Sequence, residues 1–111
     1  MTKTAARVRQ ITAQELKSLL DSGTPLELWD VRTEAERGIG RIEGARHLDP
    51  RGVQHIESLD RGTLLVFQCH HGFRSQAAAE YFLAKGFTNL CNLVGGIDAW
   101  STEVDPSVPR Y

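Results

Sequence analysis

Hydrophobic positions along this chain follow two different spacings, and each spacing predicts a different kind of element. Near the start, Leu16 and Leu20 recur at the spacing of one helical face. The helix is expected to begin at Thr12, because Thr12 and Glu15 have the spacing of a capping box, in which each side chain binds the backbone amide of the other. Gly23 follows the last of these apolar positions, where such a helix ends.

Three short, mostly apolar runs have the length and composition of strands. They are residues 26–31, 63–68 and 89–94. The middle run is almost unbroken by polar residues, as in a strand of a parallel sheet that is covered on both faces. A helical segment is expected at 33–36, where Thr33 and Glu36 again have the spacing of a capping box and where Gly38 and Gly40 would break the helix. Further helical segments are expected at 75–85 and 97–100, so strands and helices alternate. This alternation predicts an α/β domain with a central, mainly parallel sheet flanked by helices on both faces.

Length and composition indicate one globular domain. The chain has 111 residues, of which 41% are hydrophobic and 24% charged, and its formal net charge is −1. We expect a single domain over residues 1–111, with a core from about 10 to 101 and a tail at 102–111 that either docks or stays disordered. Without a basic block or an array of aromatic residues, nucleic-acid binding is not expected. The sequence offers neither a signal peptide nor a membrane-spanning run, so a cytoplasmic location without membrane contact is expected.

The stretch with the most chemistry lies between the second apolar run and the helix that follows it. It comprises Cys69, His70, His71, Gly72, Phe73, Arg74 and Ser75. A thiol at a helix N-terminus lies near free backbone amides and the positive end of the helix dipole, and Arg74 adds a permanent positive charge. Each of these influences favours the thiolate, which is the nucleophilic form. Cys69 is therefore the candidate catalytic nucleophile, and Gly72 would let the loop turn tightly.

This loop resembles the active-site loop of rhodaneses. Two other parts of the chain are similar to the outer signatures of that family: residues 28–32 with 40–45, and residues 93–100. Together the three stretches cover about 26–100 in the right order, which is more specific than any one motif. The resemblance implies a rhodanese-like fold, a catalytic Cys69 and a structural supporting role for Asp30 and Arg32. It implies no cofactor.

The activity implied by the resemblance is sulfur transfer. Cys69 would take a sulfane sulfur from thiosulfate or another small anionic donor and hold it as a persulfide that the loop stabilises. It would then pass the sulfur to a thiol or to cyanide. The pair His70-His71 resembles small bacterial rhodaneses that occur alone or joined to monothiol glutaredoxins. A glutaredoxin- or thioredoxin-like protein thiol is therefore the expected protein acceptor.

Two other functions fit parts of the pattern. Cysteine phosphatases have a similar loop, but with one more residue than the four that separate Cys69 from Arg74, so the shorter loop favours sulfur over a phosphoryl group. A non-catalytic or low-turnover sulfur-relay or binding module would keep the fold, although such modules commonly lack the loop cysteine. Neither the physiological donor and acceptor nor the oligomeric state follows from the sequence.

Two further features have a structural interpretation and a chemical alternative. Cys91 lies inside an apolar run, so we expect it to pack in the core, with a redox role as the alternative. No metal is expected at the loop, since the adjacent His70 and His71 with one nearby thiol do not form a standard structural site.

Overall fold

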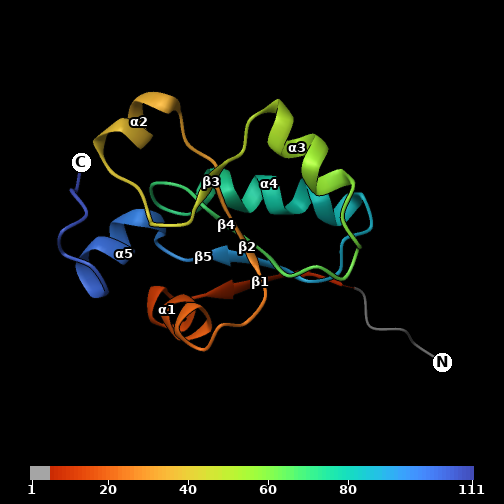
Figure 1. Ribbon diagram of the computed structural model, residues 1–111, viewed down its shortest axis with the longest axis horizontal. Helices are drawn as coiled ribbons and strands as arrows, with labels where there is room; N and C mark the ends of the chain where they lie inside the picture. Colours follow the sequence, from red (N-terminus) through yellow and green to blue (C-terminus); the bar gives the residue numbers. More distant parts are fainter. Residues whose placement is uncertain (1–5) are drawn as a thin grey trace.

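The chain folds as an alternation of strands and helices around one parallel sheet (Figure 1). A computed structural model describes residues 6–111. Its elements are β1 (Val8–Ile11), α1 (Ala13–Asp21), β2 (Glu27–Asp30), α2 (Glu34–Ile39), β3 (Arg46–His47), α3 (Pro50–Glu57), β4 (Leu65–Gln68), α4 (Phe73–Ala84), β5 (Leu90–Leu93) and α5 (Gly96–Glu103). The strands lie in the order β1-β5-β4-β2-β3, and every neighbouring pair is parallel. The α/β class and the parallel sheet predicted from the pattern are confirmed.

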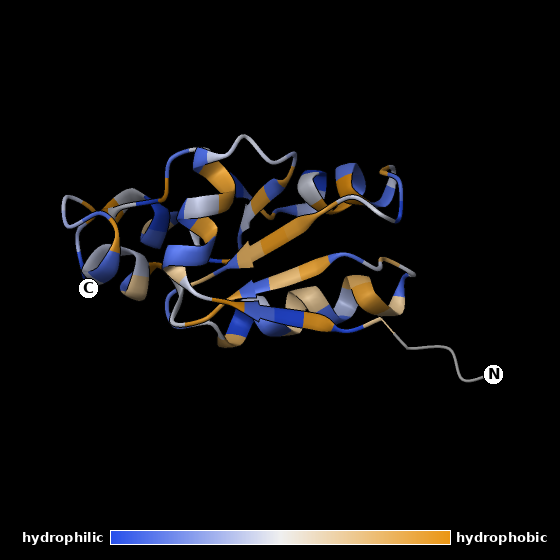
Figure 2. Cartoon of the chain, turned by 90° about the horizontal axis from the view of Figure 1, so that it is seen from below, coloured by the Kyte–Doolittle hydropathy of each residue, from blue (hydrophilic) through white to orange (hydrophobic). Residues whose placement is uncertain are grey.

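Each face of the sheet is covered by its own hydrophobic cluster. Because successive side chains of a strand point to opposite faces, Val66 of β4 packs into one cluster while Leu65 and Phe67 pack into the other. The first cluster lies under α1 and α5, and Trp100 belongs to it. The second lies under α3 and α4, and Phe82 belongs to it. The sheet is therefore the middle layer between two helical layers, and its central strands carry the hydrophobic colour in Figure 2.

Both capping boxes predicted from the sequence are present. In the first, Glu15 N donates to Thr12 Oγ1 over 3.1 Å, and Thr12 N donates to Glu15 Oε1 over 2.9 Å. In the second, Glu36 N donates to Thr33 Oγ1 over 3.2 Å, and Thr33 N donates to Glu36 Oε1 over 3.1 Å. Helix α2 continues through Gly38, where the sequence predicted a break, because one glycine inside a helix costs only about 1 kcal/mol.

Three elements lie outside the segments expected from the hydrophobic pattern. Strand β1 is at the edge of the sheet, so Arg9 and Gln10 are exposed and the strand is mostly hydrophilic in Figure 2. Strand β3 has two residues, too few for a periodic signal. Helix α3 begins after Asp49, whose side chain accepts from Gly52 N over 2.8 Å, with Pro50 in the first helical position.

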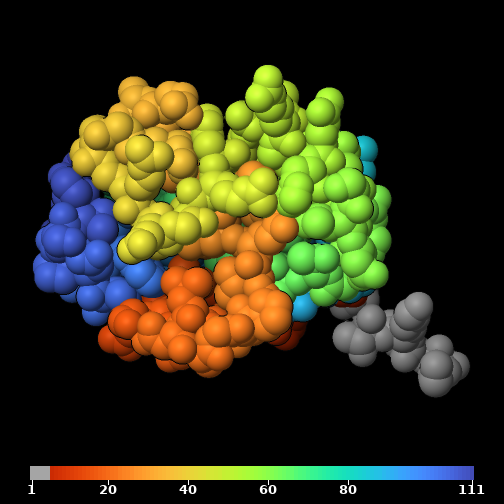
Figure 3. Space-filling view, in the orientation of Figure 1, coloured from red at the N-terminus to blue at the C-terminus, as the bar shows by residue number. Residues whose placement is uncertain are grey.

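The C-terminal residues dock on the domain. Val108 is buried in the α1/α5 cluster, and Ser101 Oγ donates to its carbonyl oxygen. Pro109 lies so close to Gly40 that a side chain at position 40 would overlap it. In Figure 3 these last residues (blue) lie against α2 and the residues that follow it (gold). Among residues 6–111, no helix has the length and apolar character needed to cross a bilayer.

Candidate active site

Cys69 follows the last residue of β4 and is buried at the carboxyl edge of the sheet. The chain then turns through the loop and enters α4 at Phe73, two residues earlier than the sequence predicted. Gly72 makes this turn possible, with a φ of +105° that side chains of L-residues rarely allow. A Cβ at this position would also lie 3.2 Å from the carbonyl oxygen of Leu93. The glycine therefore serves both the turn and the close packing of the loop on β5.

The sulfur of Cys69 lies inside a hydrogen-bond network that ties the loop to β5. Gly72 N donates to Cys69 Sγ over 3.1 Å, and Ser75 Oγ lies 3.3 Å from the same sulfur. Ser75 Oγ donates to Asn92 Oδ1 over 2.5 Å. Asn92 in turn donates through Nδ2 to Gly72 O over 3.1 Å and to Gln10 Oε1 over 2.9 Å. The amide of Asn92 thus fixes both the turn and the hydroxyl beside the thiol.

The environment of Cys69 favours the thiolate. Burial by itself would raise the pKa of the thiol, because a charge is less stable away from water. The hydrogen bond between Cys69 and the Ser75 side chain, with those from the backbone amides of Ser75, Gly72 and His71, outweighs burial, and the pKa of Cys69 is lowered. Cys91 is equally buried, but burial raises the pKa of its thiol, and it packs in the α1/α5 cluster. Of the two thiols, Cys69 has the environment of a nucleophile.

The N-terminus of α5 holds the other side of the loop. Ile97 N donates to Cys69 O over 2.8 Å, and Asp98 N donates to His70 O over 3.2 Å. Gly96 allows this approach, with a φ of +58°. A Cβ there would lie far inside the contact distance of the Cys69 carbonyl oxygen and 2.5 Å from that of His70. A glycine at position 96 is therefore needed for the closeness of these two backbone segments.

The sequence alone predicts Arg74 as a free cation at the rim of the loop, but in the structure it pairs with an acidic residue. Its guanidinium donates to Glu36 Oε1 over 2.6 Å and to Oε2 over 2.9 Å. Tyr111 adds a second donor to Glu36, with its hydroxyl 2.7 Å from Oε2, and itself accepts from Arg32 Nη1 over 3.1 Å. The hydrogen bonds from Arg74, followed by that from Tyr111, hold the pKa of Glu36 well below its usual range despite partial burial. Glu36 therefore faces Arg74 as an ionised carboxylate.

Asp30 and Arg32 form a buried ion pair beneath this arrangement. Arg32 donates to the two carboxylate oxygens of Asp30 over 2.9 and 2.8 Å, and both side chains are fully buried. Arg37 donates to the same carboxylate over 2.8 Å. Arg32 also donates to Gly40 O over 2.7 Å and so anchors the end of α2. The pair thus supports the helix that carries Glu36 instead of bonding to the Cys69 thiol.

Three aromatic rings stack beside the loop. The ring of His70 lies between those of His71 and Tyr111, with both centroid distances 3.9 Å. The ring nitrogens of the two histidines and the Asp98 carboxylate come within 4.8 Å of one another. Stacked rings direct their in-plane lone pairs side by side instead of toward one point, and Asp98 already accepts from Arg110 over 2.8 Å. This cluster is therefore better described as a packed wall of the loop than as a set of metal ligands.

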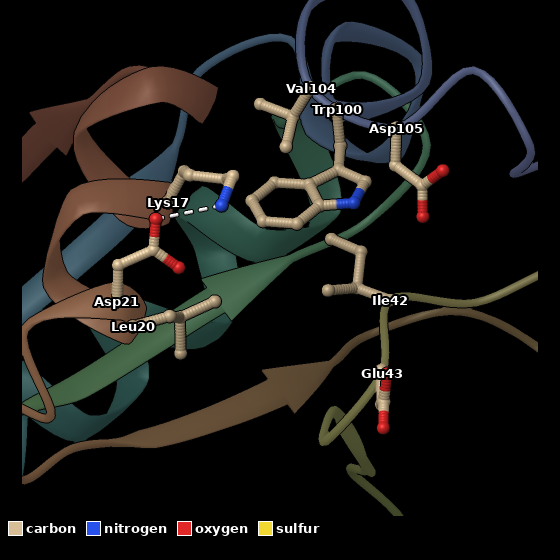
Figure 4. Close-up of a pocket in the computed structure, with 8 residues that line it drawn as sticks. All are labelled: Lys17, Leu20, Asp21, Ile42, Glu43, Trp100, Val104 and Asp105. Carbon is tan, nitrogen blue, oxygen red and sulfur yellow. Dashed lines mark hydrogen bonds and ion pairs between the residues drawn. The ribbon is translucent and has the colours of Figure 1, made fainter.

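Phe73 projects from the other side of the loop with 84% of its surface exposed. A hollow of about 330 Å³ adjoins it, and the rest of its lining comes from Gln10, His71, Gly72, Gln76, Asn92, Val94 and Gly95. A second hollow of about 370 Å³ lies between α1, the segment before β3 and α5 (Figure 4). Lys17 and Asp21 pair with each other at its edge, and its lining residues all lie outside the loop. Of these two hollows, the first is the one lined by residues of the loop that carries Cys69.

Three residues of the site were not predicted from the sequence. Glu36 was already explained as half of a capping box, so nothing indicated its second contact. Tyr111 lies in the tail, where no periodic signal exists. Asn92 did have a signal, because it is a polar residue inside a strand that is otherwise buried and apolar.

Comparison with known proteins agrees with this geometry. The model of the rhodanese-like domain family matches residues 12–103. Thiosulfate sulfurtransferase GlpE of Pseudomonas aeruginosa is 33% identical over 93 residues, which are 83% of this chain and 83% of GlpE. A rhodanese-like domain protein from Staphylococcus aureus superposes with a TM-score of 0.74 at 28% identity, over 94% of this chain and 99% of that one. The human single-domain sulfurtransferase TSTD1 has a TM-score of 0.71 at 28% identity, over 87% and 98%. The chain therefore belongs to the rhodanese family of sulfurtransferases.

Proposed function

We propose that Cys69 is the catalytic nucleophile and carries the transferred sulfur as a persulfide. The observation that supports this most is the donation from Gly72 N to Cys69 Sγ, at the N-terminus of α4, together with the lowered pKa of the thiol. Loop amides that stabilise a thiolate would equally stabilise the terminal anion of a persulfide. The loop residues His70, His71, Gly72, Phe73, Arg74 and Ser75 form the binding site for the donor and for this persulfide.

The reaction has two steps. The Cys69 thiolate attacks the outer sulfur of thiosulfate, a new S–S bond forms, the S–S bond of thiosulfate breaks, and sulfite leaves with the electron pair. A thiolate or cyanide then attacks the outer sulfur of the persulfide, and the Cys69 thiolate is released. Arg74 has five N–H donors, of which Glu36 occupies two, so the others are available to orient a donor oxygen.

A protein thiol of the glutaredoxin or thioredoxin type is the acceptor that we propose. The exposure of Phe73 beside the hollow of about 330 Å³ supports this, because an apolar side chain so fully exposed next to a reactive thiol suits contact with a partner protein. We further propose a cytoplasmic location, where Cys69 and Cys91, both free in this structure, would stay reduced.

Formation of thiocyanate from thiosulfate and cyanide tests the role of Cys69. Wild type and Cys91→Ser should turn over at similar rates, whereas Cys69→Ser should be inactive. Turnover by Cys69→Ser, or its loss in Cys91→Ser alone, would contradict the assignment. The matched serine substitutions at two equally buried cysteines separate a chemical role from a packing role.

A further inference from the structure

Glu36 lies where it can influence the charge of any molecule that reaches Arg74. Its side chain is 18% exposed, compared with 45% for Arg74, so it lies deeper than the arginine it pairs with. Both of its carboxylate oxygens accept from Arg74, and Oε2 also accepts from the Tyr111 hydroxyl. A helix cap needs none of these contacts, since the cap joins Glu36 only to Thr33.

Of the other arginines described around the loop, two share one carboxylate and a third has a carboxylate of its own. Arg32 and Arg37 share Asp30, and Arg110 pairs with Asp98 over 2.8 Å. Arg32 and Arg37 are buried, so a donor that approaches the loop instead meets the exposed guanidinium of Arg74, whose positive charge is already balanced by Glu36. Such a guanidinium still donates hydrogen bonds to an oxygen atom, but it compensates little of a second negative charge.

We propose that Glu36 selects sulfur donors by charge, so that the site favours donors with one negative charge over dianions such as thiosulfate. The inference rests on the proposed function, in which Cys69 accepts the sulfur, and it assigns to Glu36 the role of a specificity-determining residue. Donors of the favoured class are thiosulfonates and persulfide anions. Their single charge leaves the Arg74–Glu36 pair intact, whereas the second charge of thiosulfate is repelled by the carboxylate.

Two donors isolate the effect of charge. Thiosulfate and methanethiosulfonate both carry a sulfane sulfur on a sulfur–oxygen centre, with two negative charges in the first and one in the second. In both cases the Cys69 thiolate forms a bond to the sulfane sulfur and the donor's S–S bond breaks. Sulfite leaves from thiosulfate and methanesulfinate from methanethiosulfonate, each with the bonding electron pair, so the reactions are balanced in the same way.

Glu36→Gln removes the charge and keeps the shape. A glutamine at this position still completes a capping box, so α2 should form as before. Glu34→Gln is the matched control, because Glu34 lies on the same helix and its carboxylate pairs with His47 at 2.7 Å, away from Arg74. Thermal unfolding of both variants checks that they are folded to the same extent.

The experiment measures the ratio of kcat/KM for methanethiosulfonate to that for thiosulfate, with cyanide as acceptor. In Glu36→Gln this ratio should fall about tenfold, the effect of one charge acting over roughly 10 Å at an effective dielectric of about 20. In Glu34→Gln it should stay within about twofold of wild type, because an exposed charge farther away is screened. An unchanged ratio in Glu36→Gln, with both donors active, would overturn the inference. Failure of both donors to load Cys69 in wild type would instead overturn the proposed function.

Discussion

Gly96→Ala tests the contact between α5 and the loop that carries Cys69. Its φ of +58° costs an L-residue about 1–2 kcal/mol. The new Cβ would overlap two backbone carbonyl oxygens, those of Cys69 and His70, which cannot turn away as a side chain can. Separating the segments weakens the hydrogen bonds donated by Ile97 N and Asp98 N, worth about 0.5–1.5 kcal/mol each. The free energy of unfolding should therefore fall by about 2–5 kcal/mol.

Urea unfolding measures this loss, and the rate of thiocyanate formation measures its effect on the site. Because the loop must move to make room, we expect a fall in kcat/KM of at least about tenfold even under conditions where the variant is fully folded. Gly44→Ala is the matched control, because Gly44 also has a positive φ, of +85°. Its added Cβ would have open space around it: among residues 6–111, no heavy atom outside Gly44 and its two chain neighbours lies within 4 Å. It should lose only about 1–2 kcal/mol and keep its activity. Equal losses of stability and activity in the two variants would refute the role of close contact at Gly96.

Three other predictions concern the buried Asp30–Arg32 ion pair, the Tyr111 hydroxyl and the two thiols. Asp30→Asn leaves Arg32 buried without its carboxylate and should destabilise the fold by about 3–5 kcal/mol in urea unfolding; a loss below about 1 kcal/mol would contradict the contact. Tyr111→Phe keeps the aromatic stack but removes one hydroxyl, so it should cost about 1 kcal/mol by the same measurement, and no loss would mean that the hydroxyl is solvated. The pKa of Cys69 is lowered, and only the thiolate reacts with iodoacetamide. Alkylation of Cys69 should therefore reach half its maximal rate at a lower pH than alkylation of a cysteine peptide, whereas Cys91, whose pKa is raised, should do so at a higher pH. The reverse order of the two cysteines would contradict the electrostatics of the site.

Much of the fold follows from local signals. The capping boxes at Thr12 and Thr33 place two helix starts, and the apolar run that becomes β4 identifies a strand buried on both faces. Strand β1 escapes such reasoning because its place at the edge of the sheet, set by pairing with β5, permits polar residues. Local patterns thus predict elements whose own side chains form the core, and fail where a distant partner supplies the stabilisation.

The same division holds for the site. Cys69, Gly72 and Arg74 lie within one short loop, so their chemistry can be predicted from spacing alone. Glu36 and Tyr111 reach that loop from 38 and 37 residues away from Arg74, and only the folded chain brings them together. Their contacts change the expected role of Arg74 from a free cation to a member of a balanced ion pair.

Mass spectrometry of the protein after incubation with a sulfur donor tests the central claim most directly. Wild type treated with thiosulfate or methanethiosulfonate should gain one sulfur atom, located on Cys69 by peptide mapping and removed by cyanide. Cys69→Ser should gain none, and Cys91→Ser should behave as wild type. Sulfur on Cys91, or no sulfur on folded wild type with either donor, would contradict the account of Cys69 as the carrier of a transferable persulfide.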